Sequence, residues 1–288
     1  MQKFLYMGSA VELLRFLDGI SGIPYARLRA LLRKGEIRIN GKKVYENLKV
    51  NQGDEIMVYG NIQFKPVVLY EDINILAVYK RKGIKTDGDD GFLGQMRSYK
   101  GYESIRLCHR LDTNTDGIVL FAKDESVERE IEFAFRGHLV EKKYLALVNG
   151  LYSCGDGVKR AYLSKDGEEG TVTVSGEYFK GAEEIETRFQ CVEKLKNFGL
   201  SILDITLITG KTHQIRAHLK YLGHFVIGDS KYGDDRINRK FHASKQQLTS
   251  YKVSFRFGEE SPLEYLNEKN IELKDPRSFI RIPEEIDI

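Results

Sequence analysis

The sequence predicts an α+β protein in which a small α/β module precedes a larger, strand-rich domain. The first 60 residues combine two amphipathic helices with a hairpin, and Pro66 marks a boundary. From Val67 onward, apolar strand-like runs outnumber helices and do not alternate with them regularly, which favours α+β over a doubly wound sheet. The length of 288 residues fits a large domain plus a small one. We expect four segments: 1–60, a linker 61–66, a main domain 67–258 and an acidic C-terminal extension 259–288.

Composition excludes several classes of protein. Hydrophobic residues make up 41% and charged residues 30%, so the chain can bury a core and lacks the composition of a disordered protein. No apolar run approaches the roughly 18–20 residues of a membrane-spanning helix, and Met1–Ala10 does not resemble a signal peptide. The three cysteines, Cys108, Cys154 and Cys191, form no C-x-x-C pair, which argues against a disulfide framework and a cysteine zinc site. These features predict a cytoplasmic protein without a membrane partner.

Helices open the small module. Apolar residues from Val11 to Leu17 recur at helical spacing, and a break is expected at Gly19–Pro24. A second helix is predicted over Tyr25–Lys34, ended by Gly35 at the position of a left-handed cap. The alternating run Glu36–Val44 then contains Asn40-Gly41, a strong signal for a two-residue hairpin. A further strand is predicted over Glu55–Tyr59, after the turn at Gly53-Asp54.

Positive charge is concentrated in this module. Residues 1–60 carry 10 Lys and Arg against 6 Asp and Glu, whereas residues 259–288 carry 4 against 9. Within the second helix, Arg29 and Arg33 share a face, which costs a few tenths of a kcal/mol unless an anion lies across them. A solvated basic helix has the same pattern, so the charge alone leaves open whether a polyanion binds here. The candidate contact residues are Arg27, Arg29, Arg33 and Lys34.

The main domain is predicted from apolar runs and two helical stretches. The predicted strands are Val67–Tyr70, Ile75–Tyr79, Gly117–Ala122, Tyr144–Val148 and Leu200–Ile208. The two helices are predicted over Glu125–Phe135 and His213–Leu222. The acidic end is expected to wrap the surface with apolar anchors such as Phe279 and Ile282.

Common catalytic and metal-binding motifs are absent. Gly210-Lys-Thr212 is not the end of a phosphate-binding loop, because Ile205 stands where that motif needs glycine. His213 and His218 are five residues apart and do not match a helical zinc pair. Cys108 has no sequence pattern around it that would activate its thiol, and it is interpreted as a small buried hydrophobic residue. We therefore expect neither a metal nor a cofactor.

Two segments could carry chemistry. In His109–Lys123, a polar loop containing Asp112 leads directly into an apolar strand, a common position for catalytic groups, although turn aspartates look the same. In Leu207–Lys220, a strand ends before Gly210 and Thr212 can cap a helix. Arg216 on that helix could pair with a carboxylate and hold it ionised, or form a surface ion pair of little consequence.

Taken together, these motifs resemble two known families. His109-Arg-Leu-Asp-x-x-Thr-x-Gly117, the later Thr209-Gly-Lys-Thr-His-Gln-Ile-Arg216 and Gly228-Asp-Ser-Lys-Tyr-Gly233 are similar to the RluA-type pseudouridine synthases over about residues 66–256. Glu141–Gly150 and Phe241–Ala243 match further motifs of that family. The run Leu31–Gly41, with Val50 and Gly53-Asp54 after it, resembles the S4 RNA-binding domain over about residues 11–60, although Pro24-Tyr25 replaces its usual Ser-Arg pair.

The resemblance implies a mixed-sheet catalytic domain that converts uridine in RNA to pseudouridine without metal or cofactor. It places Asp112 on the family's nucleophile, Tyr144 on the tyrosine that packs against the target base, and Arg216 on the basic partner of the aspartate. It further implies that Leu219 lines the pocket and that His109 and Arg110 shape the catalytic loop and help extrude the base.

The chain also departs from the family pattern and leaves alternatives open. Asp116 stands where serine is usual, and we expect it to point away from Asp112. Two further departures from the family pattern, at Lys80–Gly83 and at Lys211, are expected to matter less. A non-catalytic RNA-binding or ribosome-assembly factor on the same scaffold is the alternative, and a metal-dependent hydrolase would need ligands that the sequence lacks. The expected partner is large-subunit ribosomal RNA, with small-subunit RNA and tRNA open, and the expected state is a monomer.

Overall fold

The structure, a computed structural model, describes residues 2–6, 10–20, 23, 25–59, 66–165 and 170–282. By contacts the chain divides into two compact units, one of 1–66 with 81–103 and one of 67–80 with 104–288. The predicted domains, with their bounds at residues 60, 66 and 258, stay predictions. Across the described ranges, no helix has the length and apolar character needed to cross a membrane.

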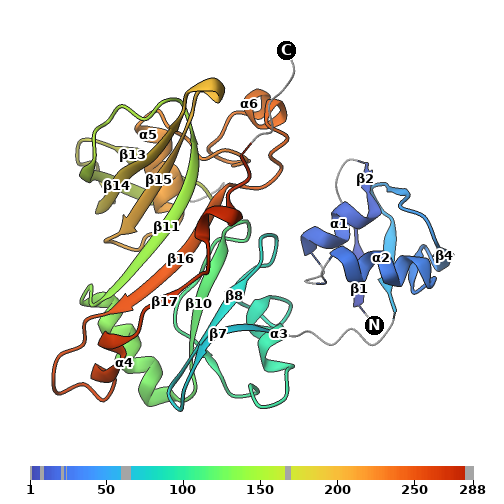
Figure 1. The fold of residues 1–288 in the computed structure, drawn as a ribbon, viewed down its shortest axis with the longest axis horizontal. Helices are drawn as coiled ribbons and strands as arrows, with labels where there is room; N and C mark the ends of the chain where they lie inside the picture. The colour runs from blue at the N-terminus through green and yellow to red at the C-terminus, as the bar shows by residue number, and fades with distance from the viewer. Residues whose placement is uncertain are drawn as a thin grey trace. The chain divides into compact units, whose positions relative to one another are not determined.

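Among its described residues, the first unit contains a small antiparallel sheet, a two-stranded pair and short helices (Figure 1). Its elements are β1 (Gln2–Leu5), β2 (Val11–Glu12), α1 (Leu13–Ile20), α2 (Tyr25–Arg33), β3 (Ile37–Ile39), β4 (Lys42–Val44), β5 (Lys49–Val50), β6 (Glu55–Val58) and α3 (Phe92–Arg97). The sheet order is β1-β6-β3-β4, and β2 pairs with β5.

The elements predicted for residues 11–59 are confirmed where the structure describes them. The stripe predicted from Val11 on forms α1, although Val11 itself pairs in β2. Gly35 is left-handed, with φ 66°, and ends α2 as predicted. Asn40 and Gly41 both have positive φ and join β3 to β4 as the predicted hairpin. The predicted break was wrong at its start, because α1 extends through Gly19 and Ile20. Residues 21, 22 and 24 of the break lie outside the described residues, as does the linker up to residue 65.

The second unit is built on one large mixed sheet. Its elements are β7 (Val67–Glu71), β8 (Ile75–Lys80), β9 (Arg106–Leu107), β10 (Asp116–Ala122), α4 (Glu125–Arg136), β11 (Val140–Asn149), β12 (Gly157–Lys165), β13 (Val172–Ser175), β14 (Glu183–Leu195), β15 (Leu200–Leu207), α5 (Gln214–Tyr221), α6 (Asp235–Lys240), β16 (Leu248–Phe255) and β17 (Ile271–Glu272). The strand order is β13-β12-β14-β15-β11-β16-β10-β8-β7, with β17 beside β16 and β9 beside β10. β10 and β16 run parallel, and the other pairs are antiparallel.

Strand register places α5 and Tyr144 on the same face of this sheet. Tyr144 of β11 pairs with Ile205 of β15, which pairs with Phe189 of β14, so their side chains share a face. Ile185, four residues before Phe189, packs with Ala217 of α5. The helix and Tyr144 therefore approach each other on one side of the sheet, and Figure 1 shows α5 beside β13, β14 and β15.

The opposite face carries the largest core. Leu145 and Leu147 of β11 point there and pack in one cluster with Val127 and Ile131 of α4. α4 begins at Asp124, whose side chain accepts from the Val127 N–H as an N-cap. This core holds the sheet rigid behind the face that carries α5.

The C-terminal segment adds to that core. Leu263 and Ile271 are buried within it, and β17 pairs with β16. Phe279 contacts the ring of Tyr79 at 5.3 Å between centroids, in line with its predicted anchoring. The second predicted anchor was wrong: Ile282 is 37% exposed, and Ile280, two residues earlier, is buried instead.

Sequence patterns also missed part of the sheet. β12, β13 and β14 were not predicted. Charged residues interrupt β12 and β14, as in the β14 run that begins at Glu183, and β13 is a short strand of four residues. The five predicted strands and two predicted helices are present in this unit, with bounds shifted by a few residues.

Candidate functional site

Asp112 lies on the loop between β9 and β10, on the side of the sheet that carries α5. A turn fixes the loop, because the Thr115 N–H donates to the Asp112 carbonyl at 3.0 Å. Lys80, at the end of β8, is fully buried and donates from Nζ to the carbonyls of Asp112 and Thr113 at 3.3 Å each. The Thr115 hydroxyl also accepts from the Gln246 amide. The loop backbone is therefore held from both of its flanks.

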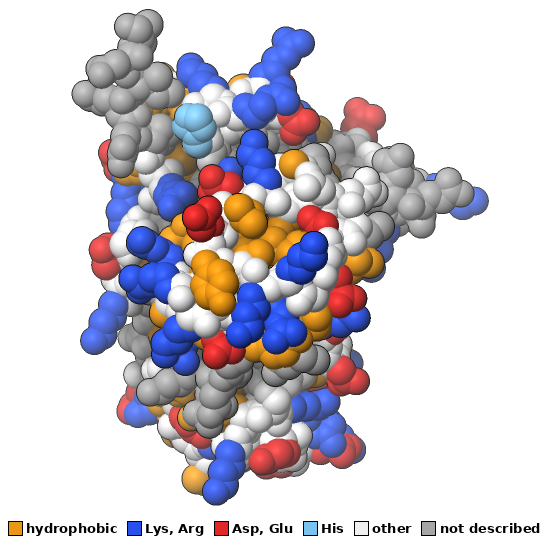
Figure 2. Space-filling view, turned by 90° about the vertical axis from the view of Figure 1, so that its right-hand side faces the viewer, with side chains coloured by type: hydrophobic (Ala, Val, Ile, Leu, Met, Phe, Trp, Pro, Cys, Tyr) orange, Lys and Arg blue, Asp and Glu red, His pale blue; other side chains and the backbone are white. Residues whose placement is uncertain are grey.

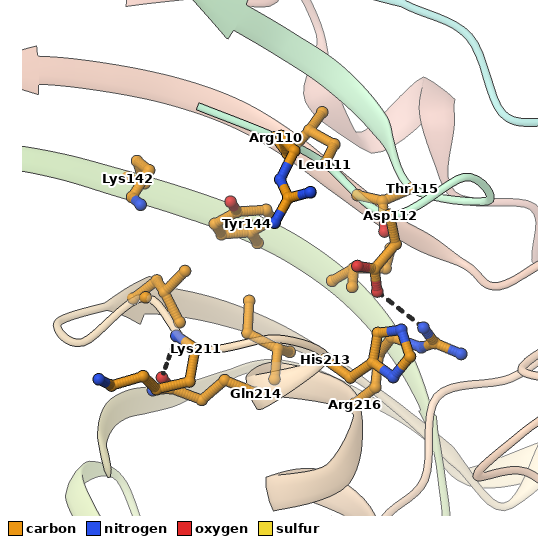
Figure 3. A pocket seen from close by; sticks show the side chains of 14 residues that line it. Arg110, Leu111, Asp112, Thr115, Lys142, Tyr144, Lys211, His213, Gln214 and Arg216 are labelled. Atoms are coloured by element: carbon orange, nitrogen blue, oxygen red, sulfur yellow. Dashed lines mark hydrogen bonds and ion pairs between the residues drawn. The ribbon is translucent and has the colours of Figure 1, made fainter. Parts of the chain in front are cut away.

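Arg216 of α5 joins two carboxylates. Its Nη1 donates to Asp112 Oδ2 at 2.7 Å, while Nε and Nη2 donate to the two oxygens of Asp229 at 2.6 and 2.8 Å. The Asp112 side chain is 27% exposed, whereas that of Asp229 is 0% exposed. Arg216 is thus anchored by a buried, bidentate pair. It presents a further donor, Nη1, to the accessible carboxylate of Asp112 (Figure 3).

The electrostatics of this triad keep its buried members charged. Burial raises the pKa of Asp229, but bonds from Arg216 and from the Lys231 and Tyr232 N–H groups outweigh this, and the net pKa is lowered. Burial lowers the pKa of Arg216, yet its bonds to Asp229 and Asp112 bring it above the ordinary value. The cation beside Asp112 is therefore permanent.

Tyr144 forms the wall opposite Arg216. A β-bulge between Lys143 and Tyr144 shifts the pairing of β11 with β16, and bulges commonly redirect side chains beside active sites. Tyr144 is 5% exposed, and burial raises the pKa of its hydroxyl, so it stays protonated. Lys142, two residues earlier, lies over the Phe135 ring at 4.7 Å, and burial lowers its pKa to about 8.

The turn before α5 is fixed by a buried glutamine. Gln214 accepts from the Thr209 hydroxyl at 2.9 Å and from the Lys211 N–H at 3.0 Å, and it donates to the Glu186 carbonyl at 3.1 Å. The predicted cap at Thr212 was wrong, because α5 starts one residue later and His213 is its N-cap, with φ 53° and no side-chain cap bond. This left-handed residue tightens the turn. The polar groups of the loop are therefore hydrogen-bonded by the Gln214 side chain instead of by a capping hydroxyl.

These groups line a pocket that is open to solvent. It is lined by charged and polar groups together with an aromatic ring and aliphatic side chains (Figure 3): Arg110, Leu111, Asp112, Thr115, Lys142, Tyr144, Leu207, Gly210, Lys211, His213, Gln214, Ile215, Arg216 and Leu248. A flat ring could stack on Tyr144 while an anionic carboxylate acts at its edge. The pocket thus brings together all three residues that the sequence proposes as catalytic.

The remaining predicted residues of this unit are not all in the pocket. Arg110 is exposed and lines the pocket beside Tyr144 (Figure 3). His109 is not a lining residue; its Nε2 accepts from the Leu120 N–H at 3.2 Å, and burial lowers its pKa to about 3. Leu219 is fully buried in α5 and does not line the pocket, whose aliphatic lining includes Ile215 one turn earlier.

Asp116 points away from the pocket, as expected. Its two carboxylate oxygens accept from the Tyr79 hydroxyl at 2.9 Å and the Thr249 hydroxyl at 2.7 Å. Tyr79 packs on the core side of the sheet, the face opposite α5. The departure from the family's serine therefore does not place a second carboxylate beside Asp112.

The four basic candidates of the first unit are exposed along α2, with Arg29 and Arg33 on one face and Arg27 and Lys34, seven residues apart, on another. Arg27, Arg29 and Arg33 lie on α2 and Lys34 directly follows it, and all four are exposed. Within the residues that the structure describes, none of them forms an ion pair. Figure 2, which faces the side at the right of Figure 1, shows Lys and Arg side chains spread widely over that surface.

Three groups that shape the site were not predicted from the sequence. Asp229 lies in the quoted Gly228–Gly233 motif, which was the signal available for it, but no role was assigned. His213 and Lys80 were considered only in other contexts, and nothing in their spacing indicated that they approach Asp112. In the described part of the chain, no cluster of three or more His, Cys, Asp or Glu side chains could hold a metal.

Comparison with known proteins gives a consistent result. The family model for RNA pseudouridylate synthase matches residues 74–221. Ribosomal large subunit pseudouridine synthase C of Escherichia coli K12 is 32% identical over 246 residues, covering 77% of this chain and 75% of the relative. The protein of the same name from Vibrio parahaemolyticus is 30% identical over 252 residues, covering 80% and 77%.

Solved structures share the fold of the chain. Human RNA Pseudouridylate Synthase Domain Containing 1 aligns with a TM-score of 0.62 at 23% identity, over 76% of this chain and 87% of that one. Human RNA Pseudouridylate Synthase Domain Containing 4 aligns with a TM-score of 0.58, also at 23% identity, over 74% and 89%.

Proposed function

Because the chain belongs to the family of RNA pseudouridylate synthases, we propose that it uses Asp112 to isomerise uridine in large-subunit ribosomal RNA. Membership of this family means that the protein is an RNA-modifying isomerase and that its partner is RNA. The choice of large-subunit RNA is supported by the relatives from Escherichia coli and Vibrio, whose names specify that subunit. We further propose that the enzyme acts in the cytoplasm as a monomer, without metal or cofactor.

The Asp112–Arg216 contact carries the proposed mechanism. Arg216 engages only Oδ2 of Asp112, and no described residue bonds Oδ1, so this oxygen is left for the substrate. Attack of Oδ1 on C1′ breaks the N1–C1′ bond, and the electron pair leaves with the uracil ring. After the base rotates, C5 bonds to C1′ and releases Asp112, C5 loses its proton and N1 gains one. A partly buried carboxylate with a fixed cation is the group that this sequence of steps needs.

The other proposed residues bind the target nucleotide. Uridine must leave its stack at a cost of a few kcal/mol, and stacking on the ring of Tyr144 would offset part of this. Arg110 is exposed at the pocket beside Tyr144 and is proposed to help hold the base out. His109 and Leu219 are proposed to act through the catalytic loop and α5, since neither lines the pocket.

Residues 1–60 are proposed to form an S4-like RNA-binding domain. Their own core and the exposed basic residues Arg27, Arg29, Arg33 and Lys34 support this assignment. Such residues would contribute contacts to phosphates that do not depend on base sequence and that weaken as salt is added.

A map of pseudouridines in total RNA tests the proposal. Cells that lack the gene are complemented with the wild type, with Asp112→Asn or with Asp116→Asn as a matched control. We expect one or a few large-subunit sites to disappear, and the wild type and Asp116→Asn to restore them while Asp112→Asn does not. Restoration by Asp112→Asn would refute its role as nucleophile, and loss of sites only in other RNAs would refute the proposed target.

A further inference from the structure

A chain of hydrogen bonds joins His213, which lines the pocket, to Tyr232 and Val172. The Val172 N–H donates to the Tyr232 hydroxyl oxygen at 2.9 Å, and His213 Nδ1 lies 3.0 Å from the same oxygen. This oxygen accepts from Val172, and its single proton can be donated to His213 Nδ1. In neutral imidazole Nδ1 then accepts, and the ring proton sits on Nε2.

Nε2 is the ring nitrogen that can reach the substrate. His213 lines the pocket, and Figure 3 shows its ring beside Arg216, with one nitrogen turned toward the side that holds Asp112. No described residue bonds Nε2, whereas Nδ1 is taken by Tyr232. His213 also has φ 53°, a conformation that non-glycine residues seldom adopt and that recurs at functional sites.

We propose that His213 is a further catalytic residue, donating a hydrogen bond from Nε2 to O2 of the target uracil as the N1–C1′ bond breaks. This inference rests on the proposed function. When that bond breaks, the electron pair spreads from N1 onto the carbonyl oxygens, and O2 is the oxygen next to N1 and C1′. A donor beside Asp112 is therefore best placed for O2, and the proton stays on Nε2 throughout.

The surroundings favour a neutral donor here. Burial lowers the pKa of His213, and burial also raises the pKa of Tyr232, so the hydroxyl keeps the proton that it donates to Nδ1. A cationic imidazolium would compete with Arg216 for Asp112 and occupy the attacking carboxylate. The Tyr232 ring is itself held beneath the Arg216 guanidinium at 5.1 Å, so the donor and the Asp112 partner form one rigid unit.

Two substitutions at His213 separate this role from a structural one. In His213→Gln the amide nitrogen can occupy the place of Nε2, whereas in His213→Asn it reaches only the place of Nδ1. Asn, however, tolerates the left-handed backbone better than Gln. A catalytic donor therefore predicts that Gln is more active, and a residue needed only for the turn predicts that Asn is more active.

The measurement is the single-turnover rate on a ribosomal RNA fragment that contains the mapped uridine, alongside the dissociation constant for the same fragment. We expect His213→Asn to lower the rate about 10²-fold, the typical cost of one lost oxyanion donor, and His213→Gln to retain at least about tenfold more activity than Asn. Binding should change less than about threefold in both. Equal rates, or a faster Asn variant, would overturn the inference.

A substrate analogue tests O2 without altering the protein's fold. With 2-thiouridine at the target position, sulfur is the poorer acceptor, so the wild type should slow on the thio substrate while His213→Asn should slow much less. An equal effect on both proteins would exclude contact with O2. If wild type and Asp112→Asn are alike inactive on ordinary uridine, the proposed function itself fails, and that outcome is distinct from a failure at His213.

Discussion

At the scale of single residues, the site depends on the unequal sharing of Arg216 between two carboxylates. The pair with Asp229 is bidentate and fully buried, while the contact with Asp112 uses one donor and is partly exposed. Arg216 is therefore oriented by a group that the substrate does not touch. Two carboxylates therefore share one cation, and Asp112 contacts it through a single oxygen, Oδ2.

Asp229→Asn tests this division of roles. The asparagine keeps the shape of the side chain, but it cannot accept both Arg216 donors, so a buried cation loses part of its compensation. We expect the free energy of unfolding to fall by about 3 kcal/mol and the single-turnover rate to fall at least tenfold while RNA binding is maintained. Urea denaturation and rapid-quench assays measure these quantities. A variant as stable and as active as the wild type would show that Asp229 does not position Arg216.

A buried histidine on the same helix predicts an acid-dependent loss of stability. His218 is fully buried, and burial lowers its pKa to about 4 from an ordinary 6.5. Between these values the unfolded chain binds a proton that the folded chain does not, so stability is full above pH 6.5 and falls as the pH approaches 4.

His218→Phe removes this titration and keeps a ring beside Phe189, which His218 contacts at 5.4 Å. As the pH is lowered from 7 to 4, the wild type should lose about 3 kcal/mol more unfolding free energy than the variant. Urea titrations at several pH values measure it, and other groups cancel in the comparison. A difference that stays constant with pH would contradict the assignment.

The sequence could indicate some of these residues and not others. Asp112, Tyr144 and Arg216 stand in recognisable motifs, and the structure brings them into one pocket. Asp229 stands in a motif too, but its partner became evident only from the fold. His213 depends on Tyr232, 19 residues away, and Lys80 on a loop 32 residues away. Such contacts arise from strand order, which spacing along the chain does not encode.

At the scale of elements, β10 positions the catalytic loop through its parallel pairing with β16. Gly117 pairs with Ser250 and has φ 120°. A Cβ at this position would lie 2.0 Å from the Ser250 carbonyl oxygen, so only glycine allows the two backbones to approach this closely. The approach occurs five residues after Asp112, where the loop enters the sheet.

Gly117→Ala should therefore both destabilise the protein and displace Asp112. Gly155→Ala is the matched control, because Gly155 also has positive φ, 71°, but a Cβ there meets nothing within 4 Å. The control should cost about 1–2 kcal/mol from backbone strain alone, and Gly117→Ala at least about 2 kcal/mol more. Urea denaturation of both variants gives the comparison, and equal losses would mean that the contact with Ser250 is relieved cheaply.

Elements were predictable where their residues are buried on both faces. Every residue of β10 is buried, and this strand was evident as an apolar run. β14 is longer, but one face is exposed and carries charged side chains, so no apolar run marks it. The bounds of α5 were missed by one residue at each end, because His213 adopts a left-handed conformation that no helix signal announces.

At the scale of the whole molecule, each compact unit has a core of its own. A cluster centred on Leu13, Leu28 and Ile56 stabilises the first unit, and separate clusters stabilise the second. Positive charge in residues 1–60 exceeds negative charge, 10 against 6, and the basic residues along α2 lie on the surface. The pocket residues lie in the second unit, so the basic residues of α2 can be replaced without changing the pocket lining.

Replacing Arg27, Arg29, Arg33 and Lys34 together by Gln tests whether these residues bind RNA phosphates. Each lost phosphate contact should reduce the slope of log K against log salt by roughly 0.7–0.9, so the variant should bind with a slope smaller by up to about 3 and more weakly at low salt. Its single-turnover rate at saturating RNA should remain within about twofold, because the pocket is unchanged.

The matched control neutralises four exposed basic residues of the second unit: Arg188, Lys194, Lys196 and Lys274. Filter binding from low to moderate salt compares the two variants. We expect the slope to change only for the α2 variant, since general surface charge acts by long-range attraction, whereas condensed counterions are released where cations meet phosphates. If the slope changed equally in both variants, RNA affinity would depend on overall charge, and α2 would be a solvated basic helix without phosphate contacts.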